Sequence, residues 1–285
     1  MNKVAIIGAG RLGTHLGYAL STKDYHIISA SCQSLSSAKK SIKIIGEGVP
    51  FTDNKRAAKN AEIIILCVPD DQIKDVVTEL SSLSFQNKFV FHCSGLLSSQ
   101  ILDPLQKTGA LTASIHPVQS FPKKGRRTDL FHHIYFGVEG METAQKTARK
   151  MVKQLGGHSF MLQPDKKPLY HTACTLASNH FVVLLEMAGH LLRKTEIDKN
   201  LQNKILLPLV EGTLRNIEKN TLSGSLTGPV SRGDLETLKS NLKSLQKHPS
   251  ILKIYKALSL QALNLADKEE RLPKKKINRM RDLLE

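Results

Sequence analysis

Three polar side chains stand where short apolar segments end, and their types suit acid–base chemistry. His92 and Ser94 close the segment Phe89–His92, and His116 ends the segment Ala110–His116. A histidine can donate or accept a proton near neutral pH, and a serine hydroxyl can do either in a hydrogen bond. Two interpretations of His116 are open: a proton donor or substrate orienter, or a structural histidine. For His92, which precedes a turn, we expect a structural role.

A second set of polar residues lies on one predicted helix, Leu169–Leu192 and the turn before it. Lys167, His171, Cys174 and Ser178 are three or four residues apart, so they lie on one face of this helix. Because buried polar groups need partners, this stripe on an otherwise apolar helix favours a cleft, which His171 and Asn179 would line. The alternative for Lys167 and His171 is an exposed first turn. The apolar remainder of the helix predicts a buried central helix.

The most specific motif is the run Gly8-Ala9-Gly10-Arg11-Leu12-Gly13, which has the spacing G-x-G-x-x-G. It directly follows the apolar segment Val4–Ile7 and opens a helical segment, which is the context of a dinucleotide-binding turn. In such turns the first glycine permits a tight bend and the second lets the backbone approach a pyrophosphate. The third lets the helix pack on the strand. The sequence therefore predicts cofactor contacts along Gly8–Gly13, Arg11 and Leu12 included.

The next strand end discriminates between NAD and NADP. An NAD site usually places a carboxylate about 20 residues beyond the glycines, but here Gln33 and Ser34 occupy that region. The absence of a carboxylate favours NADP over NAD. Lys39 and Lys40 either contact the 2′-phosphate or form a solvated helix face, and both interpretations are open.

A third part of the predicted site, Val68 to Asp70, lies at the end of Glu62–Val68, a segment with a strong preference for a β-strand. Ligands of doubly wound sheets lie outside the carboxyl ends of the strands. Val68, Pro69 and Asp70 are therefore expected beside the cofactor, although Asp70 or Asp71 is better interpreted as a cap of the following helix.

Alternating elements must position these residues. Short apolar strands alternate with amphipathic helices up to about residue 155, which predicts a parallel sheet covered on both faces. Beyond Pro164 the periodicity is helical only. We expect an α/β fold with a doubly wound Rossmann domain over residues 1–160. An all-α domain over residues 161–285 follows.

The composition of the chain indicates which kinds of partner and location to expect. The net charge of +16 admits nucleic-acid binding, but Trp is absent, aromatics are 5%, and the basic residues are spread along the chain. Nucleic acid is thus an improbable partner, and a small anionic ligand is favoured. No apolar run is long enough for a membrane span. The four cysteines form no C-x-x-C pair, so we expect no metal site and a cytoplasmic location.

The motifs together resemble a family of Rossmann-like oxidoreductases whose C-terminal half is a domain of unknown function. The resemblance runs in order from Val4 to about Leu265. It rests on Gly8–Gly13, Val68-Pro69-Asp70, His92–Gly95, His116–Pro122, Tyr170-His171 with Ser178-Asn179, and Leu226–Asp234. The family is similar to the 6-phosphogluconate dehydrogenase-like superfamily, which includes pyrroline-5-carboxylate reductase, ketopantoate reductase and prephenate dehydrogenase.

This resemblance implies an NAD(P) cofactor and a C-terminal all-α domain of the 6-phosphogluconate dehydrogenase type, which often forms a homodimer. Ser94 and His116 look like the serine and His-Pro motif of prephenate dehydrogenases, in which the histidine touches the substrate hydroxyl. The helix with Lys167, His171 and Asn179 looks like the Lys/Asn helix of hydroxyacid dehydrogenases, although its spacing departs from theirs.

We therefore predict an NADP-dependent oxidoreductase that acts on a small oxo, hydroxy or imino acid. The expected catalytic residues are His116, Ser94, His171 and Asn179. The expected cofactor-binding residues are Gly8, Gly10, Arg11, Leu12, Gly13, Gln33, Ser34, Val68, Pro69, Asp70 and Ser94. The alternative is a non-catalytic NADP-binding sensor or scaffold, which would bind the nucleotide without turnover.

Overall fold

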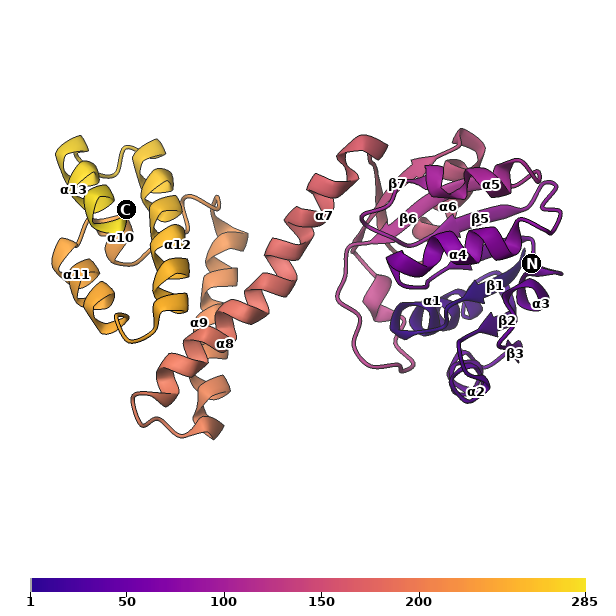
Figure 1. Ribbon diagram of the computed structural model, residues 1–285, viewed down its shortest axis with the longest axis horizontal. Helices are drawn as coiled ribbons and strands as arrows, with labels where there is room; N and C mark the ends of the chain where they lie inside the picture. Colours follow the sequence, from indigo (N-terminus) through magenta and orange to yellow (C-terminus); the bar gives the residue numbers. More distant parts are fainter. Residues whose placement is uncertain (1) are drawn as a thin grey trace. The chain divides into compact units, whose positions relative to one another are not determined.

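The computed structural model describes residues 2–285 (Figure 1), and the chain divides into two compact units. The first unit ends at His180, and the second comprises Phe181–Glu285. The first unit has two buried apolar clusters, one on each face of its sheet, and the second unit has one.

The first unit is built on one sheet with the strand order β3-β2-β1-β4-β5-β6-β7-β8. The strands are β1 (Asn2–Ile7), β2 (Tyr25–Ser31), β3 (Val49–Phe51), β4 (Ile63–Leu66), β5 (Phe89–His92), β6 (Leu111–Pro117), β7 (Tyr135–Gly140) and β8 (His158–Met161). The first six run parallel, β7 is antiparallel to β6, and β8 is parallel to β7. The doubly wound α/β fold expected from the sequence is confirmed.

Helices cover both faces of this sheet, as Figure 1 shows. They are α1 (Arg11–Ser21), α2 (Leu35–Ile45), α3 (Asn54–Ala58), α4 (Asp70–Leu80), α5 (Asp103–Gln106) and α6 (Glu142–Gln154). The last helix of this unit, α7 (Lys167–Thr175), leads away from the sheet. Apolar side chains of α1, α2 and α6 pack on one face. Those of α3, α4 and α5 pack on the other, so the central strands are buried on both sides.

Three features of the sheet differ from the sequence-based expectation. The edge strands β3 and β8 are not predicted because they are short and lack a clear alternation of apolar and polar residues. β7 was expected in a parallel sheet but pairs antiparallel with β6, with Ile115 opposite Val138. Periodicity indicates that a segment is a strand, but it does not give the strand's direction.

The second unit is entirely helical. Its helices are α8 (Phe181–Arg193), α9 (Lys199–Lys219), α10 (Pro229–Arg232), α11 (Leu235–Ser244), α12 (Pro249–Lys268) and α13 (Lys274–Leu284). Its core gathers apolar residues of α10 to α13, with Leu238 and Leu263 fully buried. The all-α second part expected from the helical periodicity beyond Pro164 is confirmed. No helix within residues 2–285 is long and apolar enough to cross a membrane.

The predicted buried central helix is present, but its burial was predicted wrongly. α7 continues through a π-helical turn, Leu176–His180, into α8. Leu169 is 73% exposed and Val182 is 65% exposed. Apolar periodicity shows that a helix needs a covering surface, but it does not say whether the same chain supplies it.

Candidate functional site

The turn between β1 and α1 needs glycine at three positions for three different reasons. Gly8 has a φ of +87°, and a Cβ there would lie 2.6 Å from a methyl group of Val68. A Cβ on Gly13 would lie 2.6 Å from the carbonyl oxygen of Gly8, so a side chain would push α1 off the sheet. A Cβ on Gly10 would meet only that oxygen, at 3.9 Å. Gly10 therefore leaves open space through which a ligand can approach the backbone.

The helix that follows this turn presents its N-terminus to the same space. α1 begins at Arg11, and no side chain among residues 2–285 caps its first turn. The first N–H groups of a helix lack intrahelical partners and carry the positive end of the helix dipole. The turn therefore has the chemistry of an anion site suited to a pyrophosphate.

A groove of about 500 Å³ runs along this edge of the sheet. Six of the predicted cofactor-binding residues line it: Gly8, Gly10, Gln33, Ser34, Val68 and Pro69. Further lining comes from residues that the sequence analysis did not single out, namely Thr52, Asn54, Gln72, Val76 and Lys124. Thr52 and Asn54 were missed because they flank β3, the edge strand that periodicity did not reveal.

The remaining predicted cofactor residues lie outside this lining. Arg11 and Leu12 begin α1 directly after the turn. Asp70 begins α4, whose N-cap is Pro69 without a side-chain cap bond. The interpretation of Asp70 or Asp71 as a helix cap is thus wrong. Both aspartates lie in the first turn of α4, where a carboxylate stabilises the helix dipole.

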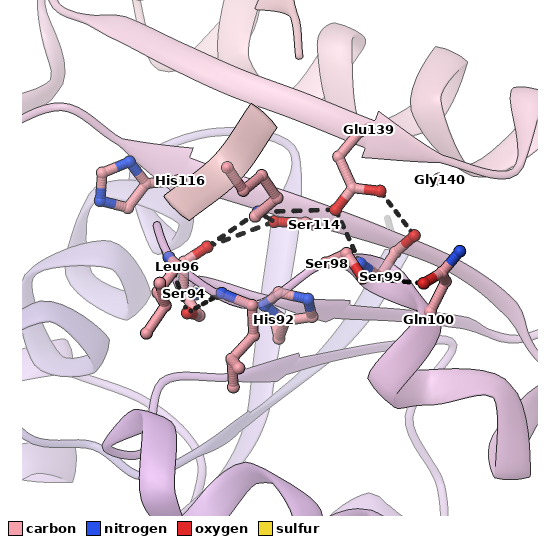
Figure 2. A network of polar contacts seen from close by, with 12 residues as sticks. His92, Ser94, Leu96, Ser98, Ser99, Gln100, Ser114, His116, Glu139 and Gly140 are labelled. Atoms are coloured by element: carbon pink, nitrogen blue, oxygen red, sulfur yellow. Dashed lines mark hydrogen bonds and ion pairs between the residues drawn. The ribbon is translucent and has the colours of Figure 1, made fainter. Parts of the chain in front are cut away.

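Beside the groove, a buried polar network joins β5, β6, β7 and α7 (Figure 2). The ammonium group of Lys167 donates to the carbonyl oxygen of Ser94 at 3.0 Å and to Oγ of Ser114 at 2.5 Å. It also pairs with the carboxylate of Glu139 at 3.5 Å. Glu139 in turn accepts two hydrogen bonds from Ser99, both of 2.7 Å.

This network corrects one interpretation of α7. Lys167 is fully buried, so it does not belong to an exposed first turn. Glu139 is only 2% exposed, which makes the two residues a buried ion pair with further hydrogen bonds. The sequence analysis missed Glu139. The available signal was a single carboxylate within the mostly apolar strand Tyr135–Gly140.

Two histidines meet above Gly95. Nδ1 of His116 lies 2.6 Å from the hydroxyl of Tyr170, and the rings of His116 and His171 have centroids 6.2 Å apart. A Cβ on Gly95 would lie 2.7 Å from Nε2 of His116 and 2.8 Å from Nδ1 of His171. Glycine at this position therefore lets both imidazole rings pack closely on the backbone, and any larger residue would displace them.

One of these nitrogens is left without a partner. Nδ1 of His171 is buried, and within residues 2–285 no hydrogen-bond partner contacts it. An unpaired buried polar atom costs free energy, so a ligand that satisfies it would bind favourably. Together with Nε2 of His116 it forms a pair of polar groups that can hold the oxygen or nitrogen of a small molecule.

The electrostatic surroundings keep His116 neutral. Burial, followed by the charges of Lys167 and His171, lowers the pKa of His116 to about 4. Burial also raises the pKa of the Tyr170 hydroxyl above its ordinary value. At neutral pH both groups are uncharged and can exchange a hydrogen bond without a net charge. These shifts favour an orienting role for His116 over that of a protonated acid.

The groove and the histidine pair lie next to each other on the sheet edge. Cys67 follows β4 and lines the groove, and its Sγ lies 3.8 Å from that of Cys93, which follows β5. Cys93 precedes Ser94, whose hydroxyl accepts hydrogen bonds from the backbone of Leu96 and Leu97. Ser94 therefore shapes the turn that holds Gly95.

The structure does not bring Asn179 into this cluster. Asn179 is exposed in the π-helical turn, and no hydrogen bond within residues 2–285 joins its side chain to the histidines. His92, by contrast, is fully buried and accepts from the backbone N–H of Ser94 at 3.2 Å. This contact agrees with the structural role expected for His92.

Two family models match the chain. Residues 1–117 match a Rossmann-like domain, and residues 134–262 match a domain of unknown function, DUF2520. No curated protein matches the sequence. The predicted combination of a Rossmann-like domain with a domain of unknown function is confirmed.

Solved structures share the fold over nearly the whole chain. A Bacteroides fragilis protein named as an NADP oxidoreductase has a TM-score of 0.77 and 20% identity, with 92% of this chain and 97% of that one covered. A Thermotoga maritima protein has a TM-score of 0.73 and 26% identity, covering 94% and 99%. The NADP-bound pyrroline carboxylate reductase of Plasmodium falciparum has a TM-score of 0.61 and 12% identity, covering 100% and 98%. A prephenate dehydrogenase of A. aeolicus has a TM-score of 0.53 and 15% identity, covering 92% and 98%, so two of the protein types named by the resemblance share the fold.

Proposed function

We propose that this chain, which joins a Rossmann-like domain to a DUF2520 domain, is an NADP-dependent oxidoreductase of a small oxo, hydroxy or imino acid. One observation carries the proposal: a glycine-lined groove follows the strand ends of the sheet, and Cys67 in its lining contacts Cys93, two residues before the Gly95 on which His116 and His171 pack. Solved structures of the same fold include a protein named as an NADP oxidoreductase.

The groove fits a dinucleotide. Gly10 leaves the backbone open to the phosphates, and the uncapped N-terminus of α1 supplies N–H donors. Cys67, Val68 and Pro69 follow β4 and line the groove, and Cys67 contacts Cys93 beside Ser94. A nicotinamide cofactor bound there would supply the hydride for reduction of an oxo or imino acid, or accept it from a hydroxy acid.

The histidine pair fits the substrate side of the reaction. Neutral His116 and the unpaired Nδ1 of His171 would bind the carbonyl oxygen, hydroxyl or imine nitrogen of the substrate. Tyr170 holds His116 through Nδ1 and so fixes the direction of its free Nε2. A hydrogen bond directed at the atom that gains or loses charge stabilises the transition state.

A titration of the purified protein with NADPH and NADH, followed by nicotinamide fluorescence, tests this function. We expect NADPH to bind, and its fluorescence to be lost only when a suitable 2-oxo or cyclic imino acid is added. Binding without turnover across such a panel would favour the alternative, a sensor or scaffold. If neither nucleotide binds, the proposed function is wrong.

Gly10→Val provides a structural control for that titration. Its side chain would fill the space opposite the phosphates, so we expect NADPH affinity to fall at least tenfold with little change in thermal stability. Gly212→Ala on α9 is the matched variant, because a Cβ there meets nothing within 4 Å. Equal NADPH affinity in both variants would exclude the glycine turn as the phosphate site.

We also propose that the protein is a homodimer through its helical part. Large apolar side chains of α8 and α9 are exposed in the single chain, including Val182 at 65% and Leu209 at 67%. Exposed apolar surface on neighbouring helices is typical of a protein–protein interface. The cytoplasmic location expected from the sequence stays a prediction.

A further inference from the structure

The segment Val118–Arg126, here called the strap, crosses from the end of β6 to the helices beside the groove. Its backbone carbonyl at Lys123 contacts Nε2 of His15 at 3.2 Å, and Phe121 stacks on the His15 ring with centroids 6.3 Å apart. At its end, Arg126 donates two hydrogen bonds of 3.0 Å to backbone carbonyls at the C-terminus of α2. These contacts fasten the strap to α1 and α2.

The fastened strap places one ammonium group at the groove. Lys124 is half-buried, lines the groove, and donates from Nζ to Oγ of Ser41 at 2.9 Å. Ser41 is fully buried on α2 and donates to the carbonyl oxygen of Ala9 at 2.8 Å, so this position is tied to the glycine turn. Among the residues that line the groove within 2–285, Lys124 is the only one with a charged side chain.

An ammonium group has three N–H donors, and the contact with Ser41 uses one of them. Two donors remain for a ligand in the groove. Ser34 and Ser37 line the same groove at the first turn of α2, directly after β2. In a dinucleotide site this region faces the ribose of the adenosine half, whereas the pyrophosphate faces the glycine turn.

We infer that Lys124 binds the 2′-phosphate of NADP and thereby makes this site selective for NADP over NAD. The inference rests on the proposed function and identifies its cofactor determinant. The positive charge for the 2′-phosphate would come from the strap after β6. In NADP sites of this fold it usually comes from an arginine near the end of β2. Lys39 and Lys40 are exposed and do not line the groove, so they are not the determinant.

The experiment measures dissociation constants of the full chain for NADPH and NADH, and for the fragments adenosine 2′,5′-bisphosphate and AMP. For Lys124→Gln we expect NADPH and the bisphosphate to bind about tenfold or more weakly, because a charge-assisted hydrogen bond is lost. Affinity for NADH and AMP should stay unchanged. Lys124→Arg should retain the preference for the 2′-phosphate.

Two matched variants serve as controls. Lys123→Gln removes the same charge from the neighbouring exposed position of the strap and should bind NADPH as the wild type does. Lys39→Gln combined with Lys40→Gln tests the competing position on α2, and here too we expect no change. Thermal denaturation of each variant shows whether its fold is retained.

Three outcomes would contradict the role of Lys124 or the proposed function, and the experiment distinguishes them. If Lys124→Gln weakens NADPH and NADH equally, Lys124 contacts the pyrophosphate and the inference is wrong. If only the Lys39/Lys40 double variant loses NADPH preference, the determinant lies on α2. If the wild type binds neither nucleotide nor fragment, the proposed function itself fails.

Discussion

At the scale of single residues, the state of His116 is decided by its neighbours. Tyr170 holds Nδ1 at 2.6 Å, and burial together with Lys167 keeps the imidazole neutral. A neutral ring with one nitrogen fixed has one defined hydrogen-bonding atom, Nε2, beside Gly95. This is the arrangement required to orient a substrate atom.

His116→Ala removes that atom. We expect turnover to fall by about 10² to 10⁴-fold, because a positioned proton-transfer or hydrogen-bonding group contributes that much. NADPH affinity should stay close to the wild-type value, since His116 does not line the groove. Steady-state kinetics and a fluorescence titration measure both quantities. Tyr170→Phe removes only the hydroxyl that holds the His116 ring, so it should lower turnover by less. An unchanged turnover rate in His116→Ala would exclude a catalytic role of His116.

The buried histidines also predict how stability depends on pH. Burial lowers the pKa of His92 to about 3 and that of His116 to about 4, from an ordinary 6.5. Above pH 6.5 the folded and unfolded states are both neutral at these positions. Below it only the unfolded state binds the protons, so the free energy of unfolding should decrease as pH falls from 6.5 toward 4.

Chemical denaturation at several pH values in this window measures the effect. The variant His92→Asn should show a shallower decrease, because one titrating group is removed. The exposed His132 provides the control, and His132→Asn should leave the slope as it is. A slope that His92→Asn does not change would contradict the assignment.

At the scale of elements, α7 is joined to the sheet through the buried pair Lys167 and Glu139. The pair connects the first turn of α7 to β7, and through Ser94 and Ser114 to β5 and β6. Tyr170 and His171 lie one turn further along α7. The position of the pair therefore determines where these two rings lie over Gly95.

Glu139→Leu should destabilise the protein by about 3 to 5 kcal/mol, since it leaves a buried ammonium group without its counter-charge. The double variant Lys167→Met with Glu139→Leu should recover most of this loss, because an apolar pair of similar size replaces the ion pair. Urea denaturation measures the coupling between the two positions. Purely additive effects would show that the two side chains do not interact.

At the scale of the whole molecule, several large apolar side chains of α8 and α9 are exposed to solvent in the single chain. A stable dimer usually buries about 800 Å² on each partner, with an apolar centre. We expect sedimentation equilibrium to give the mass of two chains. Val182→Glu or Leu209→Glu should shift the protein to monomers, because each places a charge in that apolar surface.

Lys150→Glu on α6 is the control, since it changes the charge at an exposed position of the first unit. It should leave the dimer intact. A wild-type protein that stays monomeric at high micromolar concentration would contradict the homodimer.

Features that depend on neighbours along the chain could be predicted before the fold was known. The glycine spacing with its flanking strand predicted the dinucleotide-type turn, and the change of periodicity predicted a helical second half. Strand ends gave the placement of Ser94 and His116, because parallel strands present their carboxyl ends at one edge. These are local patterns, and local backbone geometry enforces them.

Features that join distant segments became visible only in the folded chain. Glu139 and Lys167 form an ion pair although they are 28 positions apart in the sequence. Lys124 and Ser41 form a hydrogen bond although they are 83 positions apart. Neither contact leaves a periodic signal. The burial of Lys167 and the exposure of α8 likewise depend on what packs against each helix. A sequence pattern specifies which face needs a partner, but the fold specifies which partner reaches it.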